Sequence, residues 1–235
     1  MDSPVLIFNS AAEAAEACGS RSLETLDAAR RARGRAVLAV SGGNTPRIMF
    51  EWMAKQDFDW SGVQLFWVDE RCVPPDNKLS NFRMTRESLL DRVRIPAEQV
   101  HRIKGELPPE EAAKLYADEI RGVLGERPVF DLIQRGMGAD GHTASLFPGE
   151  RLIAERDGNR IAAAVWAEKM QQHRVTLVRG VLEAARATFC LATGPDKADA
   201  LKLVLQGAPN PELVPAQIRS DGTVWYVDRD AAAKL

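Results

Sequence analysis

One histidine of this sequence stands in a segment whose composition suits a catalytic base. The segment GMGADGHT, residues 136–143, places three glycines around Asp140 and His142. A histidine changes its charge near neutral pH and is the most common general base in enzymes. The other two histidines of the chain have no comparable glycine-rich surroundings. We therefore interpret His142 as a candidate base, the alternative being a histidine that only caps the following turn.

A second polar segment has the composition of an anion-binding turn. It consists of Ser41, Gly42, Gly43, Asn44, Thr45 and Pro46. Its glycines allow close approach of a ligand to the backbone, and the free N–H groups of a helix that follows would favour a phosphate. Asn44 and Thr45 add side-chain donors, although either could simply cap that helix. The Gly-Lys pair of a P-loop is missing.

A charged triplet, Asp69-Glu70-Arg71, follows another apolar run. The fixed fork of donors on Arg71 could hold an anionic or carbonyl oxygen. Asp69 could orient a water molecule, a histidine or a sugar hydroxyl. The alternative is a solvated charge cluster. Cys72 comes next, but no paired histidine motif supports a catalytic thiol.

Three basic residues further along the chain, Lys169, Arg174 and Lys197, could complete an anion pocket. Each could equally be a solvated surface charge, but all three lie near the ends of expected strands. No His-x-x-x-His motif or cysteine pair is present, so the sequence does not favour a zinc site. We expect no bound metal.

Short apolar runs alternate with helical stretches along the whole chain. Strands are expected at 5–8, 36–40, 63–68, 99–103, 130–133, 161–165, 174–178, 188–193 and 223–227, and helices at 11–33, 48–54, 82–93, 110–124 and 196–205. This alternation predicts an α/β fold, a doubly wound and mostly parallel sheet with helices on both faces. The polar loops after Val40, Val68 and Ile133 would then meet at the carboxyl edge of the sheet, where such folds bind ligands.

The overall composition narrows the class of partner. The chain has 235 residues and a formal net charge of −2, so residues 1–235 are expected to form a single domain with no basic face for nucleic acid. No signal peptide and no apolar run of about 20 residues is visible. The three cysteines are widely spaced, which favours a reducing compartment. We expect a cytoplasmic protein, a monomer or small homo-oligomer, that binds a small molecule.

The polar segments also carry a family resemblance. In order and spacing, SGGNTP, DERCVPPDNKLSN and GMGADGHTASLFPG resemble the signature blocks of the 6-phosphogluconolactonases. The later segments HRVTL, TGPDKADAL and VPAQI resemble the carboxyl-terminal half of that family. The ordered set spans nearly the whole chain and is far more specific than any one block.

The resemblance implies a Rossmann-like fold shared with aminosugar-phosphate isomerases and deaminases. It also implies hydrolysis of 6-phospho-D-glucono-1,5-lactone to 6-phosphogluconate, in the oxidative pentose phosphate pathway, without metal or cofactor. His142 would activate water, Arg71 would lie against the substrate, and Asp69 would belong to the same site. Substrate and phosphate contacts would come from Ser41, Gly42, Gly43, Asn44, Thr45, Gly138, Asp140, Gly141, Lys169, Arg174 and Lys197.

Two positions depart from the family pattern. Gln134-Arg135 precede the glycine-rich segment where the family usually has an apolar strand end, so Arg135 would either swing outward or intrude on the pocket. Lys169 is followed by Met170 and Gln171, where the family often has prolines, so the lysine would be held less firmly.

Two other functions remain open at the level of sequence. An aminosugar-6-phosphate deaminase/isomerase would be expected to have an aromatic residue in place of Arg71. A non-catalytic sugar-phosphate-binding protein would be expected to carry a helix-turn-helix segment, for which this chain has no spare length.

Overall fold

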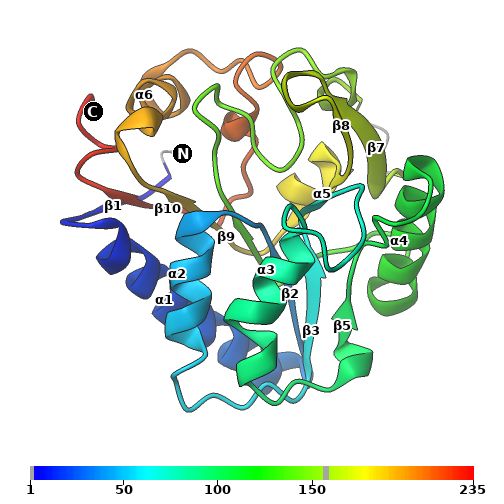
Figure 1. Ribbon diagram of the computed structural model, residues 1–235. Helices are drawn as coiled ribbons and strands as arrows, with labels where there is room; N and C mark the ends of the chain where they lie inside the picture. The colour runs from blue at the N-terminus through cyan, green and yellow to red at the C-terminus, as the bar shows by residue number, and fades with distance from the viewer. Residues whose placement is uncertain (1–2, 156–158) are drawn as a thin grey trace.

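The computed structural model describes residues 3–155 and 159–235 (Figure 1). The strands are β1 (Val5–Phe8), β2 (Ala36–Val40), β3 (Val63–Trp67), β4 (Asp69–Arg71), β5 (Val100–His101), β6 (Leu132–Arg135), β7 (Ala162–Ala167), β8 (Gln172–Leu177), β9 (Thr188–Ala192) and β10 (Thr223–Asp228). The α-helices are α1 (Ala11–Arg33), α2 (Asn44–Met53), α3 (Asn81–Ser88), α4 (Pro109–Leu124), α5 (Arg179–Ala184) and α6 (Ala198–Gln206). Short 3-10 helices include η4 (Glu168–Met170), η5 (Pro195–Lys197) and η6 (Pro215–Gln217).

The central sheet has seven parallel strands in the order β1-β10-β9-β6-β2-β3-β5. All five residues of β2 are buried, as expected for a parallel strand covered on both faces. Its register pairs Ala36 with Val63 of β3 and Leu38 with Leu132 of β6. The predicted fold class is confirmed.

Alternating side chains of β9 pack into two different clusters, because neighbouring residues of a strand point to opposite faces. Phe189 and Leu191 belong to the large core cluster that includes buried residues of α1. Cys190 and Ala192 pack in a smaller cluster with apolar residues of α6. Helices therefore cover both faces of the sheet.

The long first helix has a capping residue at each end. Ser10 caps its amino terminus, since its side chain accepts a hydrogen bond of 3.2 Å from Glu13 N. Gly34 ends the helix in a left-handed conformation with φ of 74°. The expected helix at 11–33 is confirmed.

A second sheet was not predicted. It is antiparallel, with the order β4-β8-β7 (Figure 1, upper right for β7 and β8). The triplet 69–71, interpreted above as a polar loop, forms the strand β4 and pairs with β8. Its polar side chains gave no strand signal because their burial depends on contacts with β8. Helix α5 was also not anticipated.

Several boundaries differ from those expected. Helix α2 begins at Asn44, directly after the glycine pair, which brings its amino terminus to the sheet edge. Strand β6 extends to Arg135, so both unusual residues, Gln134 and Arg135, lie inside the strand. The expected helix at 196–205 is divided into η5 and α6.

The carboxyl ends of β6, β2 and β3 lie side by side in the sheet. The chain runs from β2 toward β5 and then returns to place β6 on the other side of β2. The gap between β2 and β6 is therefore a topological switch point, the place where open α/β sheets bind ligands.

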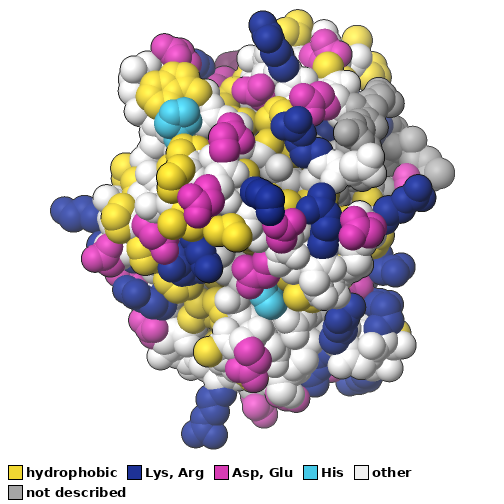
Figure 2. Space-filling model, turned by 90° about the vertical axis from the view of Figure 1, so that its right-hand side faces the viewer, with side chains coloured by type: hydrophobic (Ala, Val, Ile, Leu, Met, Phe, Trp, Pro, Cys, Tyr) yellow, Lys and Arg dark blue, Asp and Glu magenta, His cyan; other side chains and the backbone are white. Residues whose placement is uncertain are grey.

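The surface shows no large area of one charge in the view of Figure 2, where acidic and basic side chains are interspersed. In the described part of the chain, no helix has the length and apolar character needed to cross a bilayer.

Candidate active site

A cavity opens at the switch point. Its lining residues are Ser41, Gly42, Asp69, Arg71, Asn81, Gly136, Gly138, His142, Thr143, Ala144 and Arg174. The loops that follow β2, β3 and β6 thus meet in one place, as predicted. The three residues assigned to catalysis from sequence share this cavity.

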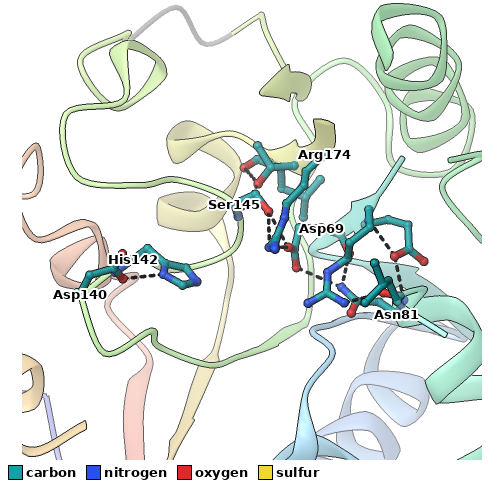
Figure 3. Close-up of polar contacts among 11 residues, drawn as sticks. Asp69, Asn81, Asp140, His142, Ser145 and Arg174 are labelled. Carbon is teal, nitrogen blue, oxygen red and sulfur yellow. Dashed lines mark hydrogen bonds and ion pairs between the residues drawn. The ribbon is translucent and has the colours of Figure 1, made fainter. Parts of the chain in front are cut away.

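His142 is held by a carboxylate on one side of its ring. Its Nδ1 atom lies 2.6 Å from Oδ1 of Asp140, and the other oxygen of Asp140 lies 3.1 Å from Nζ of Lys169. An ionised carboxylate only accepts hydrogen bonds, so Nδ1 carries the proton. No described residue bonds to Nε2 of His142. In Figure 3 the ring lies between Asp140 and the group around Asp69 and Arg174.

Asp140 stays ionised far below neutral pH. Partial burial acts to raise the pKa of this carboxyl, but the hydrogen bonds from His142 and Lys169 outweigh it and lower the pKa to about 2. The negative charge opposite Nδ1 is therefore a fixed feature of the site.

The backbone of the segment 136–143 leaves space for this histidine. A Cβ atom on Gly138 would lie 2.1 Å from Nδ1 of His142, so any larger residue would displace the ring. Gly141 adopts a φ of 79°, which glycine tolerates without strain. The glycines are required to turn the backbone around the His142 side chain.

Asp69 is buried and points into a polar cluster (Figure 3). Its Oδ2 atom lies 2.6 Å from Oγ of Ser145 and 3.8 Å from Nη1 of Arg174. Asn81 donates a hydrogen bond of 2.9 Å to its backbone carbonyl. The contact with Arg174 follows from the β4–β8 register, which places Asp69 opposite Thr176 and two residues from the Arg71–Arg174 pair.

Two guanidinium groups, those of Arg71 and Arg174, line the cavity. Arg71 donates through Nη1 to the carbonyl of Leu79, and the buried Nε atoms of both arginines have no hydrogen-bond partner in the described structure. Burial lowers the pKa of Arg174, while the nearby Asp69 carboxylate opposes that change. The guanidinium groups of both arginines thus face the cavity beside the Asp69 carboxylate, and their N–H donors suit an anionic oxygen.

Glu70 supports the site without lining it. Its buried carboxylate accepts hydrogen bonds from the backbone N–H groups of Arg71, Asn81 and Phe82 and from the Ser80 hydroxyl, at 2.7 to 3.0 Å. Burial raises the pKa of Glu70, although these bonds act to lower it. The carboxylate joins β4 to the start of α3 and so fixes Arg71 relative to Asn81.

A second cavity adjoins the first and shares Gly42 and Gly136 with it. It is lined by Gly42, Gly43, Asn44, Thr45, Pro46, Gly136, Met137, Leu191, Ala192, Thr193, Asp196 and Lys197. The Thr45 and Thr193 hydroxyls are 2.7 Å apart, which joins the turn after β2 to the turn after β9. This cavity has the donors of an anion site, namely the start of α2 and the Lys197 ammonium.

The residues predicted from sequence divide between the two cavities. Ser41, Gly42, Asp69, Arg71, Gly138, His142 and Arg174 line the first, and Gly42, Gly43, Asn44, Thr45 and Lys197 line the second. Asp140 and Lys169 stand behind His142 instead, and Gly141 lines neither cavity. The Lys169 side chain is 73% exposed and forms an ion pair with Asp140.

Two polar side chains in and beside the first cavity were not singled out from sequence. Asn81 lines the cavity, and Ser145 bonds to Asp69. Both lie inside the family-like segments quoted above, so the segments were the available signal.

Neither expectation for Arg135 is correct. Its side chain is buried, 1% exposed, and it does not line the cavity. It bonds to Thr143 and to the carbonyl of Ile218. The strand continues through this residue, which turns the side chain beneath the glycine-rich loop.

Comparison with known proteins gives consistent matches. Residues 9–225 match the model of the family described as glucosamine-6-phosphate isomerases/6-phosphogluconolactonase. The 6-phosphogluconolactonase of Mycobacterium tuberculosis is 35% identical, with 100% of this chain and 99% of that protein covered.

Solved structures agree with this. The 6-phosphogluconolactonase of Thermotoga maritima superposes with a TM-score of 0.85 at 29% identity, covering 96% of this chain and 99% of that one. A monomeric glucosamine-6-phosphate deaminase has a TM-score of 0.82 at 17% identity, covering 99% and 100% of the two chains, which shows a shared fold alone.

Proposed function

We propose that this chain, which belongs to the glucosamine-6-phosphate isomerase/6-phosphogluconolactonase family, hydrolyses 6-phospho-D-glucono-1,5-lactone to 6-phosphogluconate. The observation that carries the proposal is the Asp140–His142 pair, 2.6 Å apart, in a cavity that also contains Arg71 and Arg174. This cavity combines a histidine base with guanidinium donors for an oxyanion, the two groups that support water attack on a lactone carbonyl.

The first step is the attack of water on the lactone. His142 accepts a proton from water through Nε2, and the oxygen of that water forms a bond to the carbonyl carbon. Asp140 stabilises the imidazolium that results. The carbonyl oxygen becomes an oxyanion, for which the guanidinium of Arg71 or Arg174 provides donors.

The second step opens the ring. The bond between the carbonyl carbon and the ring oxygen breaks, and the His142 imidazolium returns its proton to that oxygen, which becomes a hydroxyl. The new carboxylic acid ionises to the gluconate. A lactone is an activated ester, so this route needs no covalent enzyme intermediate, and Cys72 has no role in it.

We place the phosphate of the substrate in the second cavity. Lys197 and the amino terminus of α2 line it, and it adjoins the cavity of His142 through Gly42 and Gly136. A phosphate held there would orient the lactone ring, so that its binding energy contributes to catalysis.

The remaining expectations follow from the same assignment. We infer that the protein acts in the cytoplasm on a free phosphosugar lactone. We also infer that the chain forms a single domain. Buried residues of both sheets, such as Leu38 of β2 and Val175 of β8, belong to one core cluster.

The direct test is an initial-rate assay of freshly generated 6-phosphogluconolactone, in which a coupled dehydrogenase reports 6-phosphogluconate. We expect the wild type to exceed spontaneous hydrolysis and His142→Ala to lose about 10²–10⁴-fold in kcat. His173→Ala is the matched control, because His173 is exposed and lines neither cavity. A folded wild type with no rate above background would contradict the proposal, and glucosamine 6-phosphate would then be tested.

A further inference from the structure

Arg135 at the end of β6 is a buried cation with an unusual environment. Its side chain is 1% exposed, and within residues 3–155 and 159–235 its hydrogen bonds go to the neutral oxygens of Thr143 and Ile218 and not to a carboxylate. Its Nε atom has no hydrogen-bond partner in the same part of the chain. Burial of a charge without a counter-charge disfavours folding. An apolar side chain would fill the same space without the free-energy cost of burying a charge. We therefore ask what the hydrogen-bond donors of Arg135 hold in place.

Those donors hold the loop that carries His142. Nη1 of Arg135 donates to Oγ1 of Thr143 at 3.0 Å, and the Thr143 hydroxyl in turn donates to the carbonyl of Gly136 at 2.9 Å. The chain Arg135–Thr143–Gly136 therefore closes the two ends of the segment 136–143. His142 is the residue next to Thr143, the point at which Arg135 is attached.

The second anchor of Arg135 lies on the far side of the loop. Nη2 donates to the carbonyl of Ile218, just beyond η6. The same segment contacts the loop again, because Ala216 N donates to the carbonyl of Gly141 at 2.9 Å. Arg135 thus binds the His142 loop and the η6 segment into one assembly.

The loop needs such an anchor because its backbone is strained. Ala144 has a φ of 54°, and in the described structure only Gln171 is another non-glycine residue with a positive φ. A left-handed alanine persists only where its surroundings hold it. The His142 ring packs directly against the backbone of this loop, because a Cβ on Gly138 would lie 2.1 Å from Nδ1 of that ring. A shift of the loop backbone would therefore move the ring.

We propose that Arg135 is a positioning residue, which acts through Thr143 to hold the His142 ring in place against the cavity. The proposal rests on the proposed function, in which His142 is the base. Arg135 touches neither cavity, so it contributes to the rate through geometry and not through contact with the substrate.

The test compares variants that remove each end of the Arg135–Thr143 contact. Arg135→Met keeps the length of the side chain without its donors, and Thr143→Val keeps the shape without the hydroxyl. Thr143→Ser restores the hydroxyl, and Arg229→Met is the control for loss of an exposed arginine. We expect Arg135→Met and Thr143→Val each to lower kcat about 10- to 100-fold with little change in KM, the cost of a displaced catalytic group. Thr143→Ser should recover most of the kcat that Thr143→Val loses, because it restores the hydroxyl, and Arg229→Met should stay near wild type.

Because the two residues share the contact through which Arg135 acts, the double variant Arg135→Met/Thr143→Val should lose less than the sum of the two single losses. If Arg135→Met does not fold, Thr143→Val against Thr143→Ser still decides the question. Unchanged kcat in folded Arg135→Met or Thr143→Val would overturn the proposal, as would losses that add in the double variant.

A second measurement separates this proposal from the assignment of the base. The chain has three histidines, so their imidazole ¹⁵N signals can be distinguished. We expect Thr143→Val to shift the His142 signals and leave those of His101 and His173 unchanged. If His142→Ala keeps its activity while this shift occurs, the base assignment fails and the positioning contact stands. If the His142 signals do not move, the positioning proposal fails whatever the activity.

Discussion

The Nδ1 atom of His142 and the Oδ1 atom of Asp140 lie 2.6 Å apart, although only one residue separates them in the sequence. The short spacing is possible because Gly141 turns the backbone between them with a φ of 79°. The pair leaves Nε2 as the proton acceptor of a neutral ring. The tautomer of His142 is therefore determined by the side chain of Asp140, which a single substitution can replace.

The first prediction concerns that side chain. Asp140→Asn keeps the shape of the group, but its amide can donate to Nδ1 and so favour the tautomer whose Nε2 already carries a proton. We expect kcat to fall by about 10²–10⁴-fold, as for other enzymes whose histidine is oriented by a carboxylate. Asp221→Asn, at an exposed position in a turn, is the matched control for loss of a carboxylate. A near-normal rate in Asp140→Asn would contradict the tautomer argument.

The second prediction concerns acid stability. The pKa of Asp140 is lowered to about 2 in the folded protein, below its ordinary value of 3.8. The folded state thus binds the Asp140 proton less readily than the unfolded state, so this carboxylate stabilises the fold above about pH 4 and the contribution is lost as the pH falls toward 2. Urea unfolding at about pH 5.5 and about pH 3 should show a smaller acid loss in Asp140→Asn than in the wild type. An equal loss in both would mean that other carboxyls account for it.

The third prediction uses the space around the His142 ring. Gly138→Ala would place a Cβ 2.1 Å from Nδ1 of His142, so the ring must move. We expect kcat to fall by about 100-fold or more while circular dichroism stays unchanged, since a displacement of about 1 Å costs that much. Gly122→Ala in α4 is the control, because its Cβ would meet no atom within 4 Å. That variant should keep its activity and gain up to about 1 kcal/mol in stability.

The sequence was sufficient to predict a strand close to each strand of the central sheet, because most of them contain a short apolar run between turn residues. Helix α1 was predicted to the residue, because its apolar residues have helical spacing and Gly34 follows its last residue. Strand β4 was missed because Asp69, Glu70 and Arg71 have the composition of a loop, and their burial depends on β8, which comes a hundred residues later in the chain.

The candidate site was also predictable in part from the sequence. Glycine-rich turns after strands indicated which residues would meet, because parallel strands share one carboxyl edge. The contact of Asp69 with Ser145 was not predictable, since it joins a strand of the second sheet to a loop of the first. The burial of Arg135 was not predictable either, because an arginine at a strand end usually reaches solvent.

The fourth prediction concerns Glu70, whose carboxylate accepts four hydrogen bonds in a buried position. Glu70→Gln would direct an amide NH₂ toward backbone N–H groups that need acceptors. We expect a loss of about 1.5–3 kcal/mol in the free energy of unfolding, the cost of hydrogen bonds to a buried charged group. Urea denaturation measures it. Glu24→Gln, on the exposed face of α1, should change stability by less than about 1 kcal/mol.

The last prediction separates phosphate binding from chemistry. Lys197 lines the second cavity but not the one that contains His142. Lys197→Met should raise KM for the phosphorylated lactone by about 10- to 100-fold, because a charge-assisted hydrogen bond is lost. The same variant should treat unphosphorylated δ-gluconolactone as the wild type does, since that substrate places nothing in the second cavity. His142→Ala, in contrast, should slow both substrates. If Lys197→Met slows both substrates equally, Lys197 acts on the lactone ring, and the phosphate must be bound by the cations of the first cavity.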